Sequence, residues 1–527
     1  MRQNISIIGS LLLLLLTINT YAQGDKINFK AAKLKSESVG GEKFRVFLST
    51  PSQRVKITQG NSTVYCDVAR ENTKTRFVTA TGNVKVVDQK TTITGDKLTY
   101  NPKNSEIVIT GKEVVLTDED LKLYTDKLYY YSKNKTAKYL TNGKVFKNTM
   151  TLTSKEGYLK EEKLDFKGNV VIDDREKDQH LESEAVTYHR DTEIATFNTE
   201  TTITSKDGDV VAQAGNYNTK TGEVNFEGEA VVENDDYVIV ADYIDSQKDS
   251  GDSYAKGNVI FYSKTDSVTI FADEVVHEGK ETKAYGNALM ARPMQGSFKN
   301  LLYMAADTLY SYNDTLTEET TLYAYHGVQV YNQDIKSKCD SLVYFYNDSM
   351  IYFYEEPVIW AQGTQMEGRT IKAQITSKGM EKMYLDRDAF VISKDSTNNY
   401  NQIKGRKIIA NMDGKKIDYI DINGNGEAIY YVMDDRTKKV EGMNVTKCAK
   451  MTMDFDDAGE LNELKYHARH DSQIVPPEQI TKENSRLSGF KIREEEKPKE
   501  TEVVSKVRKR RGVPSHLPIA FFTKKNN

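Results

Sequence analysis

The chain repeats one short phrase through most of its length. The phrase opens with Gly-Asn-Val or a close variant, continues as alternating apolar and polar residues, and ends in an Asp-x-Leu-x-Tyr stretch. Gly82 and Gly111 open two copies that lie 29 residues apart, and Gly228, Gly257 and Gly286 show the same spacing. A repeat of this length cannot bury its apolar face alone, so successive copies must stack on one another.

Each copy has the pattern of β-strands. Apolar residues alternate with polar ones, and this period of two is typical of strands with one buried face. Polar pairs such as Asp88-Gln89 are predicted to form turns. The opening Gly-Asn pair accepts positive φ and is expected to reverse the chain between strands. The sequence therefore predicts an all-β fold: an elongated β-jellyroll or two-sheet solenoid of stacked antiparallel strands.

The strongest alternating phrases identify the residues expected to line the space between the two sheets. These residues are Val84, Val86, Leu98, Tyr100, Leu128, Tyr130, Val170, Val186, Tyr188, Val259 and Phe261. A register error of one residue would place all of them on the opposite face. The alternation does not distinguish a closed core from an open slot that could bind acyl chains.

The composition excludes some classes of protein. The chain has 73 Lys and Arg against 77 Asp and Glu, a net charge of −4, which argues against a nucleic-acid partner bound through its phosphates. Its 38% hydrophobic content excludes wholesale disorder. Cys66, Cys339 and Cys448 form no Cys-x-x-Cys motif, so no zinc or redox motif is expected. Pairing between any two of them stays open.

The N-terminus has the three parts of a secretory signal peptide. Arg2 supplies a positive charge, residues 5–18 are mostly apolar, and Thr20-Tyr21-Ala22 offers small residues before Gln23. The apolar run is shorter than the roughly 20 residues that span a bilayer. We predict a signal peptide over residues 1–22, cleaved between Ala22 and Gln23, and an exported protein.

The repeat and the charge pattern divide the rest of the chain. A first module is expected over residues 23–190, a continuation over 191–300 and a divergent module over 301–470. From residue 471 to 527 the alternation stops and charges cluster. We expect a partly disordered charged tail there.

No catalytic, metal or cofactor site is expected. The sequence has neither a Gly-x-Ser-x-Gly elbow nor a phosphate-binding Gly-rich loop. His467 and His470 would lie on opposite faces of a strand, with no further ligand nearby in sequence. The recurring Asp, for example Asp96 and Asp242, precedes a hydrophobic pair, which favours a structural role.

The signal peptide and the tandem Gly-Asn-Val…Asp-x-Leu-x-Tyr units together resemble the OstA-like, or LptA-like, periplasmic proteins of Gram-negative bacteria. The resemblance covers about residues 37–470, most clearly residues 60–190. It implies a jellyroll that is open along one side and carries lipopolysaccharide across the periplasm, with the acyl chains in its groove. This chain departs from the family in its greater length and in having no evident outer-membrane barrel sequence.

The resemblance implies a non-enzymatic bridge that binds lipopolysaccharide or a related amphiphile and supports outer-membrane assembly. Its location would be the periplasm, with outer-membrane association as a further expectation. Expected partners are other lipopolysaccharide-transport proteins, joined through edge strands, and further copies of the chain, joined head to tail. Two alternatives remain: a structural or adhesive solenoid with a closed core, and a polysaccharide-active β-helix enzyme.

Overall fold

The computed structural model describes residues 26–505, apart from short gaps at 248–249, 266, 295–296, 315–316, 318, 377–378, 414–415, 435, 438 and 457–460. The protein is all-β, as the sequence predicts: 72% of the described residues lie in strands and 2% in helices. The predicted signal peptide, with its cleavage site at Ala22 and Gln23, lies outside the described residues. Residues 506–527 of the predicted tail also lie outside them.

The chain divides into two compact units, Met1–Glu176 and Lys177–Asn527. The described part of unit 1 contains β1 (Asn28–Lys30), β2 (Lys33–Val39), β3 (Glu42–Leu48), β4 (Val55–Gln59), β5 (Ser62–Cys66), β6 (Val68–Asn72), β7 (Val78–Asp88), β8 (Thr91–Asn101), β9 (Glu106–Thr117), β10 (Leu121–Tyr131), β11 (Thr136–Tyr139), β12 (Gly143–Lys147), β13 (Met150–Ser154), β14 (Glu156–Leu159) and β15 (Lys163–Asp174). Its paired neighbours run antiparallel, as β7 and β8 do.

Unit 2 continues the same architecture. Its described strands are β16 (Gln179–His189), β17 (Ile194–Phe197), β18 (Thr201–Ser205), β19 (Gly208–Ala212), β20 (Ala214–Asn218), β21 (Val224–Glu233), β22 (Tyr237–Ser246), β23 (Ser253–Ser263), β24 (Val268–Glu278), β25 (Glu281–Met294), β26 (Ser297–Asp314), β27 (Glu319–Tyr331), β28 (Ile335–Phe345), β29 (Met350–Tyr354), β30 (Val358–Ala361), β31 (Thr364–Glu367), β32 (Thr370–Thr376), β33 (Gly379–Lys394), β34 (Tyr400–Asp413), β35 (Lys416–Met433), β36 (Val440–Phe455), β37 (Leu461–Tyr466) and β38 (His470–Val475). Three short helices follow: η1 (Pro477–Gln479), η2 (Glu494–Glu496) and α1 (Glu500–Val504).

The long strands bend in the middle. In β7, Gly82 and Asn83 have φ values of 79° and 46°, and the register with β8 shifts between Thr81 and Val84. A Cβ on Gly82 would lie 2.5 Å from the Oδ2 atom of Asp67, so glycine is required here. The prediction that the Gly-Asn pair reverses the chain between strands was wrong. The pair forms a bulge inside one continuous strand and bends it into two arms.

The recurring Asp stabilises these bends. Asn258, in the bend of β23, donates a hydrogen bond from Nδ2 to Asp242 Oδ2 at 2.9 Å. Asn287 makes the equivalent bond to Asp273 at 3.1 Å, and the backbone N–H of Lys112 donates to Asp96. Each carboxylate therefore joins the bend of its own strand to the bend of the next repeat.

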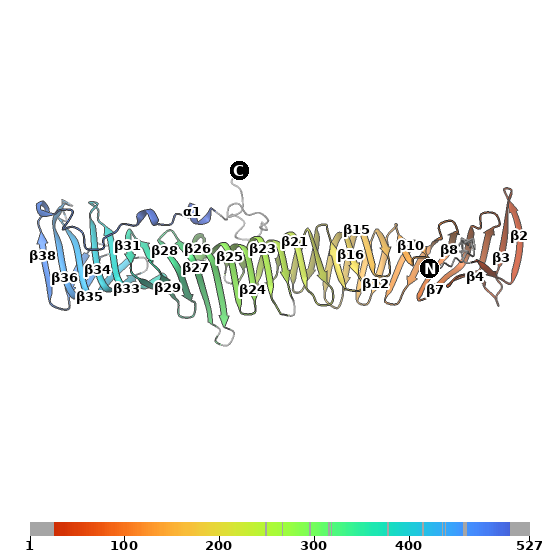
Figure 1. Ribbon diagram of the computed structural model, residues 1–527, viewed down its shortest axis with the longest axis horizontal. Helices are drawn as coiled ribbons and strands as arrows, with labels where there is room; N and C mark the ends of the chain where they lie inside the picture. Colours follow the sequence, from red (N-terminus) through yellow and green to blue (C-terminus); the bar gives the residue numbers. More distant parts are fainter. Residues whose placement is uncertain are drawn as a thin grey trace, which may run out of the picture. The chain divides into compact units, whose positions relative to one another are not determined.

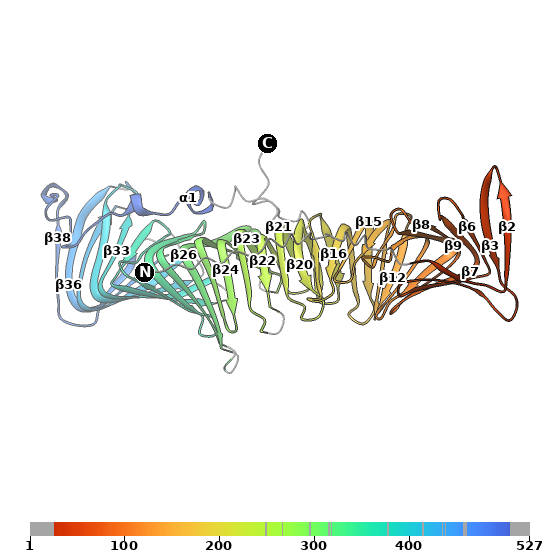
Figure 2. The ribbon, with the colours of Figure 1, turned by 45° about the vertical axis from the view of Figure 1, so that its right-hand side comes forward.

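The bends give each unit two sheet arms. We call the arm that contains Val84–Asp88 of β7, or residues 259–263 of β23, the A arm, and the arm that contains residues 78–81 or 253–256 the B arm. The face of each arm that is turned towards the other arm is its inner face. Figures 1 and 2 show the bent strands stacking side by side within each unit.

In unit 2, the A arm is apolar on its outer face as well as its inner face. From β22 onward the strands contain runs such as Val259-Ile260-Phe261-Tyr262, and runs of this kind are typical of strands buried on both sides. Two outer clusters result. One holds Val238, Val240, Ile260, Tyr262, Phe271, Leu289, Ala291, Leu301 and Tyr303, and the other holds Phe390, Ile392, Ile429, Tyr431 and Met443.

The C-terminal segment, residues 477–505, covers this outer face, and we call it the strap. Figures 1 and 2 show it running back across the strands of unit 2. Leu487 packs in the second outer cluster, and Val503 and Val504 of α1 pack in the first. The sequence predicts a partly disordered tail from residue 471, whereas residues 470–475 form β38 and the strap is packed against the sheet.

Two buried glutamines attach the backbone of the strap. The amide of Gln402 donates to the carbonyl of Ser485 and accepts from the N–H of Leu487, both at 2.8 Å. Gln365 makes the same pair of bonds, to the carbonyl of Lys491 and the N–H of Arg493. A buried amide that loses such partners costs about 1–3 kcal/mol, so the attachment is specific as well as apolar.

Charged side chains complete the attachment. The Arg493 guanidinium is 8% exposed and lies 2.8 Å from Glu496 and 3.5 Å from Glu367. Lys338 Nζ lies 3.2 Å from the same Glu496 carboxylate. The hydrogen bond from Arg493, with help from Lys338, lowers the pKa of Glu496 to about 2.

The three cysteines are buried in the sheets and form no disulfide with one another. Cys66, Cys339 and Cys448 are free and buried, and burial raises the pKa of the Cys66 and Cys339 thiols to about 12. In the described part of the chain, none of the helices combines the length and apolar character that a membrane-crossing helix needs.

Aspartate at Val503 and Val504 together is expected to release α1 from the outer face. Two carboxylates cannot stay ionised among Leu301, Tyr303 and their apolar neighbours without partners. Limited proteolysis within residues 490–505 should become about tenfold faster or more. Glu502→Gln is the control, because that side chain is more than half exposed. An unchanged cleavage rate in the double variant would contradict this account of the strap.

Acid is expected to loosen the strap through Glu496. Its pKa is lowered on folding, so its contribution to stability is complete above the unfolded value of about 4.5 and is lost as the pH falls towards 2. The protection of residues 490–500 against hydrogen exchange, relative to the intrinsic rate at each pH, should therefore fall between pH 4.5 and pH 2 in the wild type. In Glu496→Gln this protection should be lower at pH 7 and less dependent on pH. Equal pH dependence in the two proteins would show that another group controls the strap.

Candidate functional site

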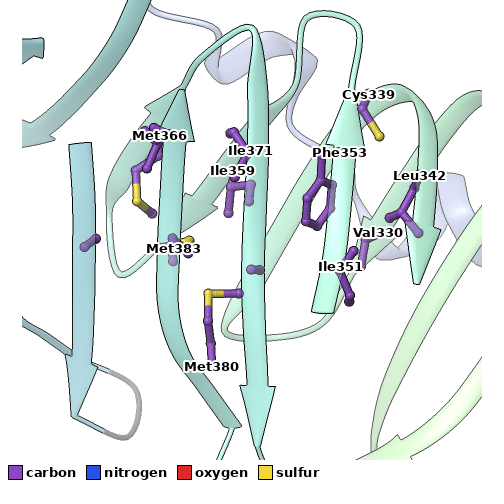
Figure 3. Close-up of a cluster of buried hydrophobic side chains, with 14 of the residues drawn as sticks. Val330, Cys339, Leu342, Ile351, Phe353, Ile359, Met366, Ile371, Met380 and Met383 are labelled. Atoms are coloured by element: carbon purple, nitrogen blue, oxygen red, sulfur yellow. The ribbon is translucent and has the colours of Figure 1, made fainter. Parts of the chain in front are cut away.

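The space between the inner faces of the A and B arms is the candidate site, and we call it the slot. In unit 2 one apolar cluster contains residues from both arms. Figure 3 shows Val330, Cys339, Ile359 and Met366 of the A arm with Leu342, Ile351, Phe353, Ile371, Met380 and Met383 of the B arm. Several methionines are among them, and their flexible thioethers adapt to irregular apolar shapes.

Exposure in this slot rises from the bend to the free ends of the arms. On β32, Ile371 and Ala373 are fully buried, whereas Ile375 on the same face is half-buried. On β34, Ile408 and Ala410 are fully buried and Met412 is half-buried. The free ends form two apolar rims that flank the mouth of the slot. Half-buried rim residues include Val268, Ile270, Leu302, Ile335, Tyr344 and Tyr346.

A cation lies at this mouth. Arg292 pairs in register with Leu302, a rim residue of the A arm, and its guanidinium carbon is 6.0 Å from the ring centroid of Tyr346 on the B arm. The ring of Tyr346 lies 4.2 Å from that of Tyr344. The mouth of unit 2 therefore combines apolar and aromatic rims with the positive charge of Arg292, an arrangement that suits an amphiphile with an anionic headgroup.

The slot of unit 1 is closed at its rims. Leu121 and Tyr130, near the free ends of the two arms of β10, are 4% and 2% exposed. The hydroxyl of Tyr130 donates a 2.7 Å hydrogen bond across the mouth to the buried carboxylate of Asp88. Burial and the nearby carboxylate raise the pKa of Tyr130, so its hydroxyl stays protonated as the donor.

The predicted lining residues fall in both units. Val84, Val86, Leu98, Tyr100, Leu128, Tyr130 and Val170 lie in unit 1, and Val186, Tyr188, Val259 and Phe261 lie in unit 2; all are buried except Phe261. Phe261 shares the face of Val259 and is half-buried. Its neighbours Ile260 and Tyr262 pack on the outer face under α1. Whether these side chains contact a ligand stays a prediction.

Sequence reasoning missed Asp88 and Arg292. The sequence predicts a turn at Asp88-Gln89, yet Asp88 has the same strand parity as Val84 and Val86 and therefore faces inward. That parity was the available signal: an acid at the end of an inward-facing series. For residues 291–302 the wider spacing of the repeat predicts an inserted loop, and this prediction was wrong: Arg292 lies in β25 and pairs with Leu302 of β26.

The described residues show little that suggests other chemistry. They contain no group of three His, Cys, Asp or Glu side chains arranged to hold a metal ion. His467 lies 2.9 Å from the hydroxyl of Thr452, and His470 stacks on Tyr466.

One family model matches part of the chain. The model of the OstA-like protein family matches residues 48–173 and 160–242. A search of the curated proteins found no match.

Two solved structures show distant similarity. LptH of Pseudomonas aeruginosa, described as the LptA-homologous periplasmic component of the lipopolysaccharide transport device, is 16% identical over 27% of this chain and 96% of its own, with a TM-score of 0.22. The WD40 domain of SCAP from fission yeast is 10% identical over 77% of this chain and 96% of its own, with a TM-score of 0.12. Scores this low carry no argument about the present chain.

Two isoleucines on one strand test the difference between the deep slot and its rim. Ile371→Ala should lower the free energy of unfolding by about 3 kcal/mol, because it leaves a cavity in a fully buried site. Ile375→Ala, on the same face of β32, should cost about 1 kcal/mol, because its side chain is already partly in water. Urea unfolding measures both. Equal losses would indicate a core that is closed up to the rim.

Proposed function

We propose that this protein, of which the OstA-like family model matches residues 48–173 and 160–242, is a non-enzymatic bridge for lipopolysaccharide or a related amphiphile. The acyl chains lie in the slot between the A and B arms and the headgroup stays outside. Carrying such a molecule towards the outer membrane supports the assembly of that membrane.

The rims of unit 2 are the observation that carries this proposal. Their apolar side chains are half-buried, so an acyl chain entering the mouth removes further apolar surface from water. Each methylene buried contributes roughly 0.8 kcal/mol. A chain of a dozen carbons therefore gains about 10 kcal/mol before the cost of ordering it.

The proposed location is the periplasm, and the sequence of the N-terminus supports it. A signal peptide cleaved between Ala22 and Gln23 would deliver the protein to the periplasm, where its cargo is found. Outer-membrane association belongs to the same proposal, because a bridge must contact the membrane that it serves.

Edge strands supply the proposed contacts with partners. In unit 1, β2 pairs with β3, and it is exposed along its whole length, including Leu34 at 62%. In unit 2, β38 pairs with β36 and exposes Ile474 at 67%. An exposed strand edge is a template for a strand of another chain. We propose that these edges join the protein to other transport proteins or to its own copies, head to tail.

A closed structural solenoid is the second candidate. The buried rims of unit 1 and the bond between Tyr130 and Asp88 favour it for that unit. A protein closed in this way would bind no acyl chains in unit 1.

The direct test is native mass spectrometry of residues 23–527 with lipopolysaccharide and with its deacylated counterpart. The proposed bridge should bind the acylated form at least about tenfold more tightly, because only the acyl chains enter the slot. Equal binding of both forms would indicate headgroup recognition instead. Binding of neither would favour the closed solenoid.

A photo-crosslinking residue shows where the lipid lies. In place of Phe261, which is inward and half-buried, p-benzoylphenylalanine should crosslink to lipopolysaccharide. The same residue in place of Lys256, which is exposed on the same strand, should not. Crosslinks from both positions would show adsorption to the surface and would contradict binding in the slot.

A further inference from the structure

One hydrogen bond joins the two arms of unit 1 at the mouth of its slot. Asp88 is the last residue of β7 on the A arm, and Tyr130 is the penultimate residue of β10 on the B arm. Their side chains meet at 2.7 Å and both are buried, at 6% and 2% exposure. Beside this bond, the ammonium of Lys135 bonds to the side-chain carbonyl of Gln89, which joins the two adjacent hairpin turns. We call this pair of bonds the tie.

The tie stands in the path of an amphiphile that moves along the slot. The acyl chains of such a molecule lie between the arms and its headgroup lies outside, so the neck between them passes through the mouth. A bond from rim to rim stops that neck. The tie must therefore open for each molecule that passes it.

Breaking the tie is also costly. Both partners are buried, and a buried polar group that loses its hydrogen-bond partner is destabilised. The rims of unit 2 differ, because Tyr344 and Ile375 are half-buried apolar residues. Closure is thus a local property of the side chains at the rims of unit 1.

We propose that the tie between Tyr130 and Asp88 is a gate across the slot of unit 1, which opens when the headgroup of an amphiphile passes. The inference rests on the proposed function for its cargo. The closed state of the mouth without cargo is inferred only from the distance between Tyr130 and Asp88 and from the burial of both side chains.

Spin labels on the two hairpins measure the opening. Lys90→Cys and Lys133→Cys place labels on exposed residues on either side of the mouth, outside the tie. The native thiols are buried. Pulsed electron-paramagnetic-resonance measurements on residues 23–527 should give one narrow distance distribution without lipid. Addition of lipopolysaccharide should produce a second population at longer distance.

Removal of the phenol oxygen is the decisive variant. Tyr130→Phe keeps the ring in the slot but loses the bond, so the longer-distance population should rise about tenfold without lipid. Tyr100→Phe is the control, because Tyr100 occupies the same position in the preceding repeat and is similarly buried. It should behave as the wild type. A Tyr130→Phe distribution identical to that of the wild type would overturn the gate.

The lipid measurement separates the gate from the proposed function. If lipopolysaccharide crosslinks to the slot of unit 1 at Leu98 while the hairpin distance stays unchanged, the cargo is correct and the gate is wrong. If lipopolysaccharide does not bind at all, the proposed function fails. The lipid-free comparison of Tyr130→Phe with Tyr100→Phe then still decides whether the bond holds the mouth closed.

Discussion

The hydrogen bond that an Asp carboxylate accepts from the bend of the next repeat is the constraint on which each unit depends. A strand of about eleven residues without a bend would belong to a single flat layer and could not enclose anything. The glycine at positive φ allows the bend, and the carboxylate sets it beside the bend of the neighbouring strand. Because the bends align from strand to strand, the arms on either side face one another, and the space between them continues along the unit.

The sequence predicts this architecture well where its alternation is regular. In unit 1, Val84 and Val86 alternate with Lys85 and Val87, and the structure buries the first pair deep in the slot while Lys85 is exposed. The alternation does not predict where the strand bends, because the preference of Gly-Asn for positive φ suits a bulge as well as a turn. Only the register of the two neighbouring strands distinguishes these, and a single sequence does not contain it.

Unit 2 shows why the alternation of apolar and polar residues no longer identifies the inner face of a strand when the outer face is also covered. Ile260 and Tyr262 break the alternation, and the cause is the pair Val503 and Val504, far away in the sequence. Runs of four apolar residues indicate burial on both faces but not what provides it. The strap has no periodic pattern, because its backbone bonds go to the side chains of Gln365 and Gln402 instead of to a strand. A segment of this kind resembles a disordered tail in sequence.

The same backbone can therefore be a closed body or an open carrier, and the residues at the rims decide which. In unit 2 the rim residues are apolar and half-buried, so part of their apolar surface is still in contact with water. In unit 1, Asp88 and Tyr130 satisfy each other across the mouth. An acid at an inner-face position is costly unless it has a partner, and Asp88 finds its partner in Tyr130 on the other side of the slot. Its presence there is better explained by a mouth that closes and opens than by a permanent core, because an apolar pair would close a core at lower cost.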